Sequence, residues 1–255
     1  MNKLLITLLS FTTLYSFGQT EIQESEFKLS HSFNCLSYQY DITTPLLYSR
    51  DTADLRYKAN DSIAAIARYF QKEIGYPYFM NPGDCPQIYQ GTEQFSIDYQ
   101  VGLNTDSFLS IVINTNHSNG NGGHGGESYS YCFNIDLVQN KSITFDSLVS
   151  PANKSHLCKY IKEHYDMLSK TSTLFENIDY FSPTDCNYVF DTFESGSIRY
   201  IGAALDSTNL TIYYSVYLGS AYNTVKDIRL PLASIKQFIN KKYWWLCRPT
   251  KPAKK

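Results

Sequence analysis

The chain has 255 residues and a mass of 29.2 kDa, with 22 Lys and Arg residues against 24 Asp and Glu residues. This length supplies enough apolar side chains for one large or two small domains. Apolar residues make up 43% of the chain and charged residues 18%, which argues against disorder of the whole chain. The net charge of −2 argues against nucleic acid as the main partner, because neutralising phosphates requires a surplus of basic residues.

The N-terminus has the pattern of a secretory signal peptide. Lys3 precedes an apolar run over residues 4–14, and the small residues Ser16 and Gly18 fit the positions before a cleavage site at Gln19. A buried first helix is the alternative, but the chain becomes polar directly afterwards. We therefore expect residues 1–18 to be removed and the protein to be exported, periplasmic or extracellular. No later stretch has the roughly 18–20 apolar residues that a membrane span needs.

The cysteines also bear on export. All six follow the signal pattern, at positions 35, 85, 132, 158, 186 and 247. An oxidising compartment predicts at least one disulfide, although the sequence does not give the connectivity, and buried free thiols are the alternative. No C-x-x-C pair occurs, which argues against a thioredoxin-like site and a zinc ribbon.

Hydrophobic periodicity predicts both helices and strands. Apolar residues at steps of three and four favour a helix over residues 51–74, ended by Gly75, and a second helix over residues 151–168. A short helix is expected after Pro231. Strict alternation predicts strands at residues 35–42, 95–103, 109–113, 129–137, 210–218 and 228–230.

This order of elements predicts an α+β fold with antiparallel sheets, two main helices and a short C-terminal helix. The predicted divisions are a signal peptide (1–18), an N-terminal strand–helix subdomain (33–92), a C-terminal α+β domain (93–245) and a basic tail (246–255).

Six short segments after residue 93 carry a resemblance to a bacterial envelope family. They are residues 99–101 (YQV), 110–113 (SIVI), 122–125 (GGHG), 133–137 (FNIDL), 144–148 (TFDSL) and 229–232 (RLPL). Together they resemble the extracellular region of anti-sigma-V factors that bind lysozyme. They are also similar to the non-catalytic module that precedes peptidoglycan deacetylase domains. The resemblance covers roughly residues 33–240. It implies an envelope-binding protein whose ligand is a lysozyme-like muramidase or peptidoglycan, with no cofactor.

A glycine-rich stretch, residues 116–127, contains the sharpest local cluster. His117, His124 and Glu127 lie in or beside it, and Asp136 follows on the next predicted strand. Imidazole and carboxylate groups could bind zinc or another divalent ion. The alternative, which we favour, is a turn or bulge that needs glycine, so no metal site is predicted. His124 and Glu127 remain candidates for ligand binding.

Catalysis is the competing functional class. Glu93 with Asp98, or Asp136 with Asp146, could flank a glycosidic bond, since glycosidases use two carboxyl groups several ångströms apart. No G-x-S-x-G elbow occurs. No catalytic residue is therefore assigned, and a small hydrolase or deacetylase-like enzyme using the Gly/His loop remains the alternative function.

Tyrosines in the last third form a second candidate binding surface. Tyr213 and Tyr217 lie on the strand face opposite Leu210 and Ile212, and Tyr222 follows shortly after. Such aromatic side chains bind proteins or glycans when they are exposed; the alternative is that a second layer covers them. For the segment at residues 243–245 (YWW), a packed terminal anchor is favoured over a binding patch.

Overall fold

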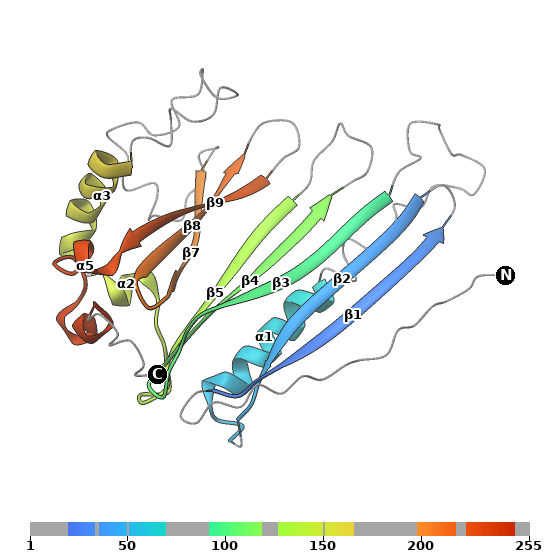
Figure 1. Cartoon of the computed structure of the whole chain (residues 1–255), viewed down its shortest axis with the longest axis horizontal. Helices are drawn as coiled ribbons and strands as arrows, with labels where there is room; N and C mark the ends of the chain where they lie inside the picture. The colour runs from blue at the N-terminus through green and yellow to red at the C-terminus, as the bar shows by residue number, and fades with distance from the viewer. Residues whose placement is uncertain are drawn as a thin grey trace, which may run out of the picture.

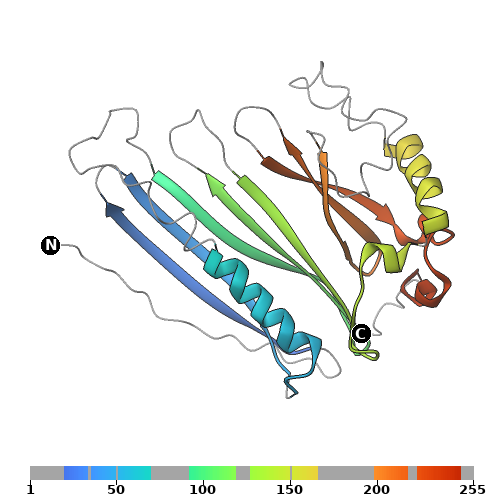
Figure 2. The ribbon, with the colours of Figure 1, turned by 180° about the vertical axis from the view of Figure 1, so that it is seen from behind.

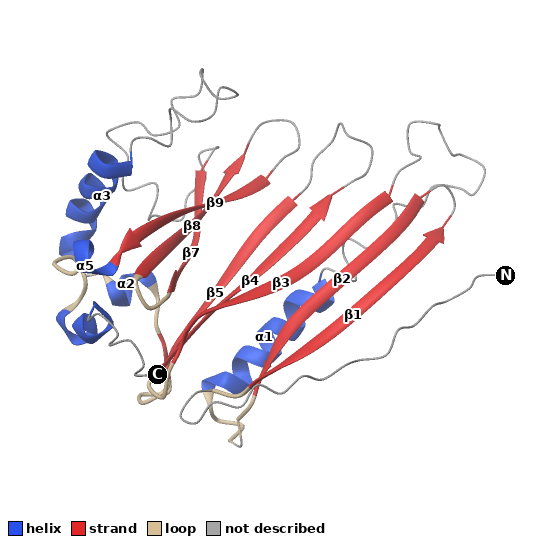
Figure 3. Cartoon of the chain, viewed as in Figure 1, coloured by secondary structure: helices blue, strands red, loops and turns tan. Residues whose placement is uncertain are grey.

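The computed structural model describes residues 20–33, 36–49, 51–69, 92–118, 127–149, 151–165, 198–217 and 223–247. Its elements in chain order are β1 (Ile22–Phe33), β2 (Leu36–Leu47), α1 (Leu55–Tyr69), β3 (Thr92–Asn104), β4 (Phe108–Ser118), β5 (Glu127–Asp136), β6 (Lys141–Ser142), α2 (Phe145–Leu148), α3 (Pro151–Tyr165), β7 (Ile198–Leu205), β8 (Asn209–Tyr217), β9 (Asn223–Pro231), α5 (Leu232–Ile235) and the 3₁₀ helix η4 (Lys241–Cys247). Figure 1 shows their arrangement and Figure 3 the distribution of helix and strand. The predicted α+β class is confirmed.

The described strands form one nine-stranded sheet with two halves. Its order is β1-β2-β3-β4-β5-β9-β8-β7, with β6 paired to β5. Neighbours are antiparallel except β2–β3, which are connected through α1, and β5–β9. The β5–β9 contact consists of a single pair, Glu127 and Asn223, so the halves β1–β5 and β7–β9 meet over a very short seam. β2 and β3 lie on either side of the predicted boundary at residue 92 and pair directly.

The first hydrophobic cluster lies between α1 and the half β1–β5, and Figure 2 shows α1 in front of these strands. Alternate residues of each strand point toward the helix, as the period of two requires. The cluster contains Tyr40, Phe95 and Ile111 from the strands and Ala59 and Ile63 from α1. Asn60 of α1 fixes the helix to the end of β2, because its side chain accepts from Leu47 N and donates to Leu47 O, both at 2.8 Å.

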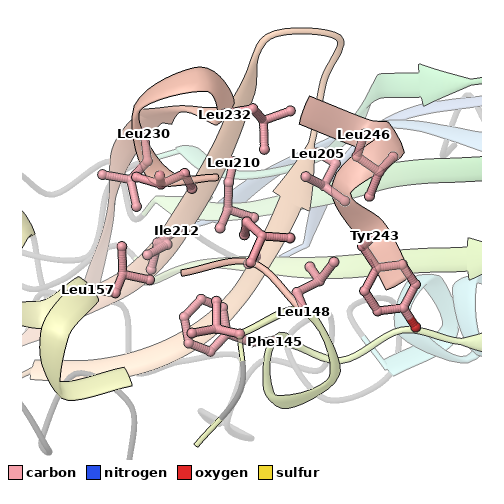
Figure 4. Packing of buried hydrophobic residues seen from close by; sticks show 14 of the residues in the cluster. Phe145, Leu148, Leu157, Leu205, Leu210, Ile212, Leu230, Leu232, Tyr243 and Leu246 are labelled. Carbon is pink, nitrogen blue, oxygen red and sulfur yellow. The ribbon is translucent and has the colours of Figure 1, made fainter. Parts of the chain in front are cut away.

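The second cluster lies on one face of β7–β9, and Figure 4 shows its packing. Leu210 and Ile212 of β8 form its middle row, between Leu205 of β7 and Leu230 of β9. Residues from α2, α3, α5 and η4 cover this row. The backbone of Asn240 donates to Leu148 O at 2.7 Å, so the C-terminal segment is fixed to α2.

The two halves also contact each other face to face, through small and polar residues. A Cβ atom added at Gly102 of β3 would lie 2.3 Å from Leu205 O, and one at Gly202 of β7 would lie 2.9 Å from Cys132 Sγ. Both glycines sit at register irregularities of their strands. Glycine at these positions thus allows the backbone of β7 to approach β3, and the Cys132 side chain to approach β7.

The element boundaries refine the sequence-based expectations. The first helix begins at Leu55 rather than residue 51, because the Asp54 carboxylate accepts from Arg56 N at 2.8 Å and so caps the helix. β1 and β7 were not predicted. Residues 70–74 and 166–168, the predicted ends of the two main helices, lie outside the described residues. Within the described part of the chain, no helix has the length and hydrophobicity to cross a membrane.

Candidate functional site

Polar side chains cover the face of β1–β5 that points away from α1, in the part not overlain by β7. We call this surface the polar face. Its side chains form cross-strand rows, because paired residues on neighbouring strands point to the same side. One row is Lys28, Asp41, Ser96, Asn116 and Ser128, and the next is Asp98, Asn114 and Ser130.

The same alternation that builds the first core also builds this face. In β3, Phe95 and Ile97 are buried toward α1, whereas Gln94 and Asp98 are exposed on the other side. In β4 the burial of the even-numbered residues decreases along the strand: Phe108 and Ser110 are buried, and Asn116 is exposed. The lower end of this face therefore packs against β7, and its upper end is open to solvent.

Hydrogen bonds across the strands hold several of these side chains in place. Asn114 Nδ2 donates to Asp98 Oδ1 at 2.8 Å, and Ser130 Oγ donates to Asn114 Oδ1 at 2.8 Å. Ser128 Oγ donates to Asn116 Oδ1 at 2.9 Å. The face is therefore partly ordered before any ligand binds, which lowers the entropic cost of binding.

A groove of about 500 Å³ lies over this face. Four strands contribute to it, β1 through β4, and its polar lining residues are Lys28, Ser30, Gln39, Asp41, Gln94, Ser96 and Asn116. Lys28 and Asp41 form an ion pair at 3.6 Å with more than half of each side chain exposed, so it contributes little to stability. Leu29, Tyr40 and Phe95 also line the groove. The amide and hydroxyl groups among the lining residues can both donate and accept hydrogen bonds.

The opposite face carries a stack of three rings at its upper end. Phe95 lies between Tyr40 and His117, with ring centroids 4.8 Å and 4.5 Å apart. His117 Nε2 lies 2.7 Å from Glu93 Oε2, and both side chains are largely buried. Burial raises the pKa of Tyr40 to about 12, with smaller contributions from Tyr38 and Glu93, so this phenol stays neutral. The stacking on Phe95 and the contact with Glu93 hold the His117 ring in place, which indicates a structural role for this residue.

The predicted His/Glu cluster is only partly in the described residues. His117 and Glu127 pair directly across β4 and β5, and Glu127 accepts from the Tyr129 hydroxyl at 3.1 Å. His124 lies outside the described residues. Asp136 is at the other end of β5, where its carboxylate accepts from the backbone of Val138 and Gln139. Among the residues that the structure describes, no three His, Cys, Asp or Glu side chains are placed to hold a metal ion.

The two carboxylate pairs considered for glycoside hydrolysis are placed differently from what that reaction needs. Glu93 bonds to His117 on the α1 side of the sheet, whereas Asp98 bonds to Asn114 on the polar face. They therefore lie on opposite sides of β3. Asp136 is buried at the turn after β5, and the exposed carboxylate of Asp146 pairs with Lys154 Nζ at 2.6 Å.

Of the three tyrosines predicted to bind a ligand, only Tyr213 has a described side chain. It is half-buried, and it faces away from the buried Leu210 and Ile212. Burial, followed by the nearby Cys132 and Asp227 side chains, raises its pKa to about 12. β5 thus covers part of this ring. The side chain of Tyr217 and all of Tyr222 lie outside the described residues, and a binding role for the three stays a prediction.

Sequence reasoning missed the polar face, although its signal was present. The polar positions Gln94, Ser96 and Asp98 alternate with the apolar ones that predicted the strand. Alternation shows that such residues share a side, but not which strands become neighbours. The parallel pairing of β2 with β3, which brings Gln39 beside Gln94, comes only from the fold.

The structure is similar to members of the DUF3298 family, a family of unknown function. One, from Bacteroides fragilis, has a TM-score of 0.54 and 15% sequence identity, and the similarity covers 92% of this chain and 100% of that chain. Another, from Pseudomonas aeruginosa, has a TM-score of 0.47 and 14% identity, with 96% and 99% of the two chains covered. No family model and no curated protein matches the sequence. The similarity to the Bacteroides fragilis protein shows that the chain has a DUF3298-type fold.

Proposed function

We propose that this protein is a non-enzymatic binding module of the bacterial envelope, exported to the periplasm or the cell exterior. Its ligand in this proposal is a glycan strand of peptidoglycan, bound in the groove of the polar face. The observation that carries the proposal is the set of amide, hydroxyl and carboxylate side chains that converge on this groove from four strands.

The chemistry of the groove suits a sugar chain. The hydroxyl and acetamido groups of a glycan include both hydrogen-bond donors and acceptors. Asn, Gln and Ser side chains can donate to the acceptors and accept from the donors. Gln39 and Gln94 pair across β2 and β3, and Asn116 lies in the neighbouring row, so consecutive sugars could meet consecutive amides. The groove volume of about 500 Å³ is within the usual range for small-ligand sites.

A muramidase-like protein suits this face less well. Stable protein interfaces bury roughly 800 Å² on each partner and depend on a few buried aromatic anchors. The polar rows of β1–β5 contain Asp, Asn, Gln, Ser and Lys but no aromatic side chain among the residues described. The two aromatic residues that line the groove, Tyr40 and Phe95, are buried. The resemblance to lysozyme-binding and deacetylase-associated modules supports both ligands, and the groove favours the glycan.

The test is co-sedimentation of residues 19–255 with insoluble peptidoglycan, using a matched pair of substitutions. Gln94→Ala removes an exposed amide from the groove, and Gln139→Ala removes an exposed amide from the turn after β5. We expect Gln94→Ala to weaken binding about 3- to 10-fold, the size of one lost hydrogen bond, and Gln139→Ala to leave it unchanged.

Three results would contradict the proposal. Wild-type protein that stays in the supernatant but captures lysozyme would assign the muramidase as the ligand. Equal effects of the two substitutions would move the site away from the groove. Release of soluble fragments from peptidoglycan by the purified protein would favour the enzyme alternative.

A further inference from the structure

The 3₁₀ helix η4 has one side in the protein core and one side in solvent. Side chains three positions apart align in such a helix. Tyr243 and Leu246 are buried in the second hydrophobic cluster. Cys247, at the end of the helix, is also buried, and the four exposed positions form two outward pairs, Lys241 with Trp244 and Lys242 with Trp245. The two lysines and two tryptophans therefore share a surface on a firmly packed element.

Both tryptophans are partly exposed to solvent. Their exposed fractions are 37% for Trp244 and 38% for Trp245. The indole N–H of Trp244 already donates to Ile239 O at 3.0 Å, and the Trp245 ring contacts Phe108 edge-on, with centroids 5.9 Å apart. The rings are thus held in place, and the exposed part of Trp244 is hydrocarbon that gains nothing from water.

Two lysines lie over the ring of Trp244, and a third lies over the ring of Tyr243. Lys236 Nζ lies 5.1 Å and Lys241 Nζ 5.9 Å from the centroid of Trp244, and Lys242 Nζ lies 4.6 Å from that of Tyr243. We call Lys236, Lys241, Lys242, Trp244 and Trp245 the Lys/Trp patch.

The patch belongs to the most basic part of the chain. Residues 228–255 contain eight of the 22 Lys and Arg residues and none of the 24 Asp and Glu residues. The rest of the chain is therefore clearly acidic. In the described part of this stretch, Lys236, Lys241 and Lys242 are exposed, and an anionic surface would be attracted to them.

We infer that the Lys/Trp patch binds the surface of a bilayer containing anionic phospholipids. Tryptophan favours the interface between headgroups and acyl chains, where its ring is sheltered and its edge stays wet. Lysines beside it reach the phosphates while their methylene stems remain in the apolar layer. The patch is shallow and does not span the membrane, so binding is peripheral and reversible.

This surface is independent of the glycan groove, which lies on β1–β4. A bound bilayer at η4 would leave the polar face open. The protein could then hold peptidoglycan while it rests on the membrane beneath.

The tryptophans make the test direct, because Trp244 and Trp245 are the only two in the chain. Residues 19–255 are titrated with vesicles of phosphatidylcholine and phosphatidylglycerol at three to one, and with vesicles of phosphatidylcholine alone. We expect a blue shift of tryptophan emission with the anionic vesicles only, reversed by high salt. Quenching by brominated acyl chains should place the rings near the interface.

A charge-matched pair of double variants locates the site. Lys241→Ala with Lys242→Ala removes two lysines of the patch, and Lys58→Ala with Lys159→Ala removes two exposed lysines elsewhere. The first should weaken partitioning by roughly tenfold or more, and the second by less than threefold. Absence of a shift with anionic vesicles would overturn the inference. So would equal losses in both variants, or binding to single-stranded DNA without binding to vesicles.

Discussion

Single asparagine side chains connect segments that lie far apart in the sequence. Asn104 at the end of β3 accepts from Thr20 N at 2.9 Å and donates to Thr20 O at 3.0 Å. Asn60 makes the same two bonds to Leu47. At each position, the side-chain amide of asparagine bonds to the backbone N–H and C=O of one residue, as a neighbouring strand would. Asn140, with φ of 47°, donates to Ala53 O and accepts from Leu55 N, which fixes the start of α1 to the turn before β6.

Substitution of Gly102 by Ala should destabilise the fold. The new Cβ would lie 2.3 Å from Leu205 O, and a backbone atom cannot move aside as a side-chain end can. We expect the free energy of unfolding to fall by about 1–3 kcal/mol, the usual cost of overpacking, in urea denaturation. Val101→Ala, at an exposed neighbour, is the control and should change it by about 0.5 kcal/mol or less. An unchanged midpoint for Gly102→Ala would mean that β7 is not seated against β3.

At the scale of elements, the side chains of β4 lie in three environments: the first hydrophobic cluster, the second hydrophobic cluster and solvent. Its odd positions Leu109, Ile111 and Ile113 lie in the cluster beneath α1. Its even positions begin with Phe108, which belongs to the second cluster, and end in the exposed Asn116. Period-two alternation predicted this strand and its odd core positions. It did not predict β7 as the partner of the even positions, because β7 is far along the chain.

A buried polar network fixes β7 against the other half. Ser110 Oγ donates to Asn134 Oδ1 at 2.7 Å and accepts from Leu205 N at 2.9 Å, and Asn134 Nδ2 donates to Ala203 O at 2.7 Å. Since these groups are shielded from water, each bond is costly to lose.

Asn134→Ala should therefore destabilise the protein by about 2–4 kcal/mol, because it leaves the Ala203 carbonyl and the Ser110 hydroxyl without this partner. Asn116→Ala is the matched control, since the exposed Asn116 accepts from the Ser128 hydroxyl on the polar face. We expect it to cost about 1 kcal/mol or less. Equal losses in the two variants, measured by urea denaturation, would contradict a special role for the buried network.

At the scale of the whole molecule, the sequence predicted the class of fold and most interior elements. Strands at 95–103, 109–113 and 210–218 are confirmed because they carry regular apolar alternation. β1 and β7 were missed, and both are at the ends of the sheet order. An edge strand needs less apolar surface, so the pattern of β1 is weak: it reads IQESEFKLSHSF. β7 reads IRYIGAAL, which is apolar but does not alternate strictly, and its register shifts between Tyr200 and Gly202. The polar face was missed for a related reason, since its residues converge only through pairing between distant strands.

The cysteines give the last prediction, because the fold separates them into two groups. Cys132 and Cys247 are free thiols in the described part of the chain. The side chains of the other four, at 35, 85, 158 and 186, lie outside the described residues. We therefore expect the predicted disulfide to form between two of these four. Burial raises the pKa of Cys132 to about 12 and also raises that of Cys247, so neither forms much thiolate at pH 8.

We expect exported protein, beginning near Gln19 by intact mass, to show no reaction of Cys132 or Cys247 with iodoacetamide while it is folded. In urea without reductant both thiols regain an ordinary pKa of about 8.5 and should be alkylated. Peptide mapping should then find Cys132 and Cys247 labelled and at least one pair of the other four protected until a reductant is added. Alkylation of all six cysteines in urea without reductant would show that the protein has no disulfide and would contradict the prediction. Recovery of Cys132 in a disulfide would contradict the packing of β5 against Gly202, since its sulfur lies against that backbone.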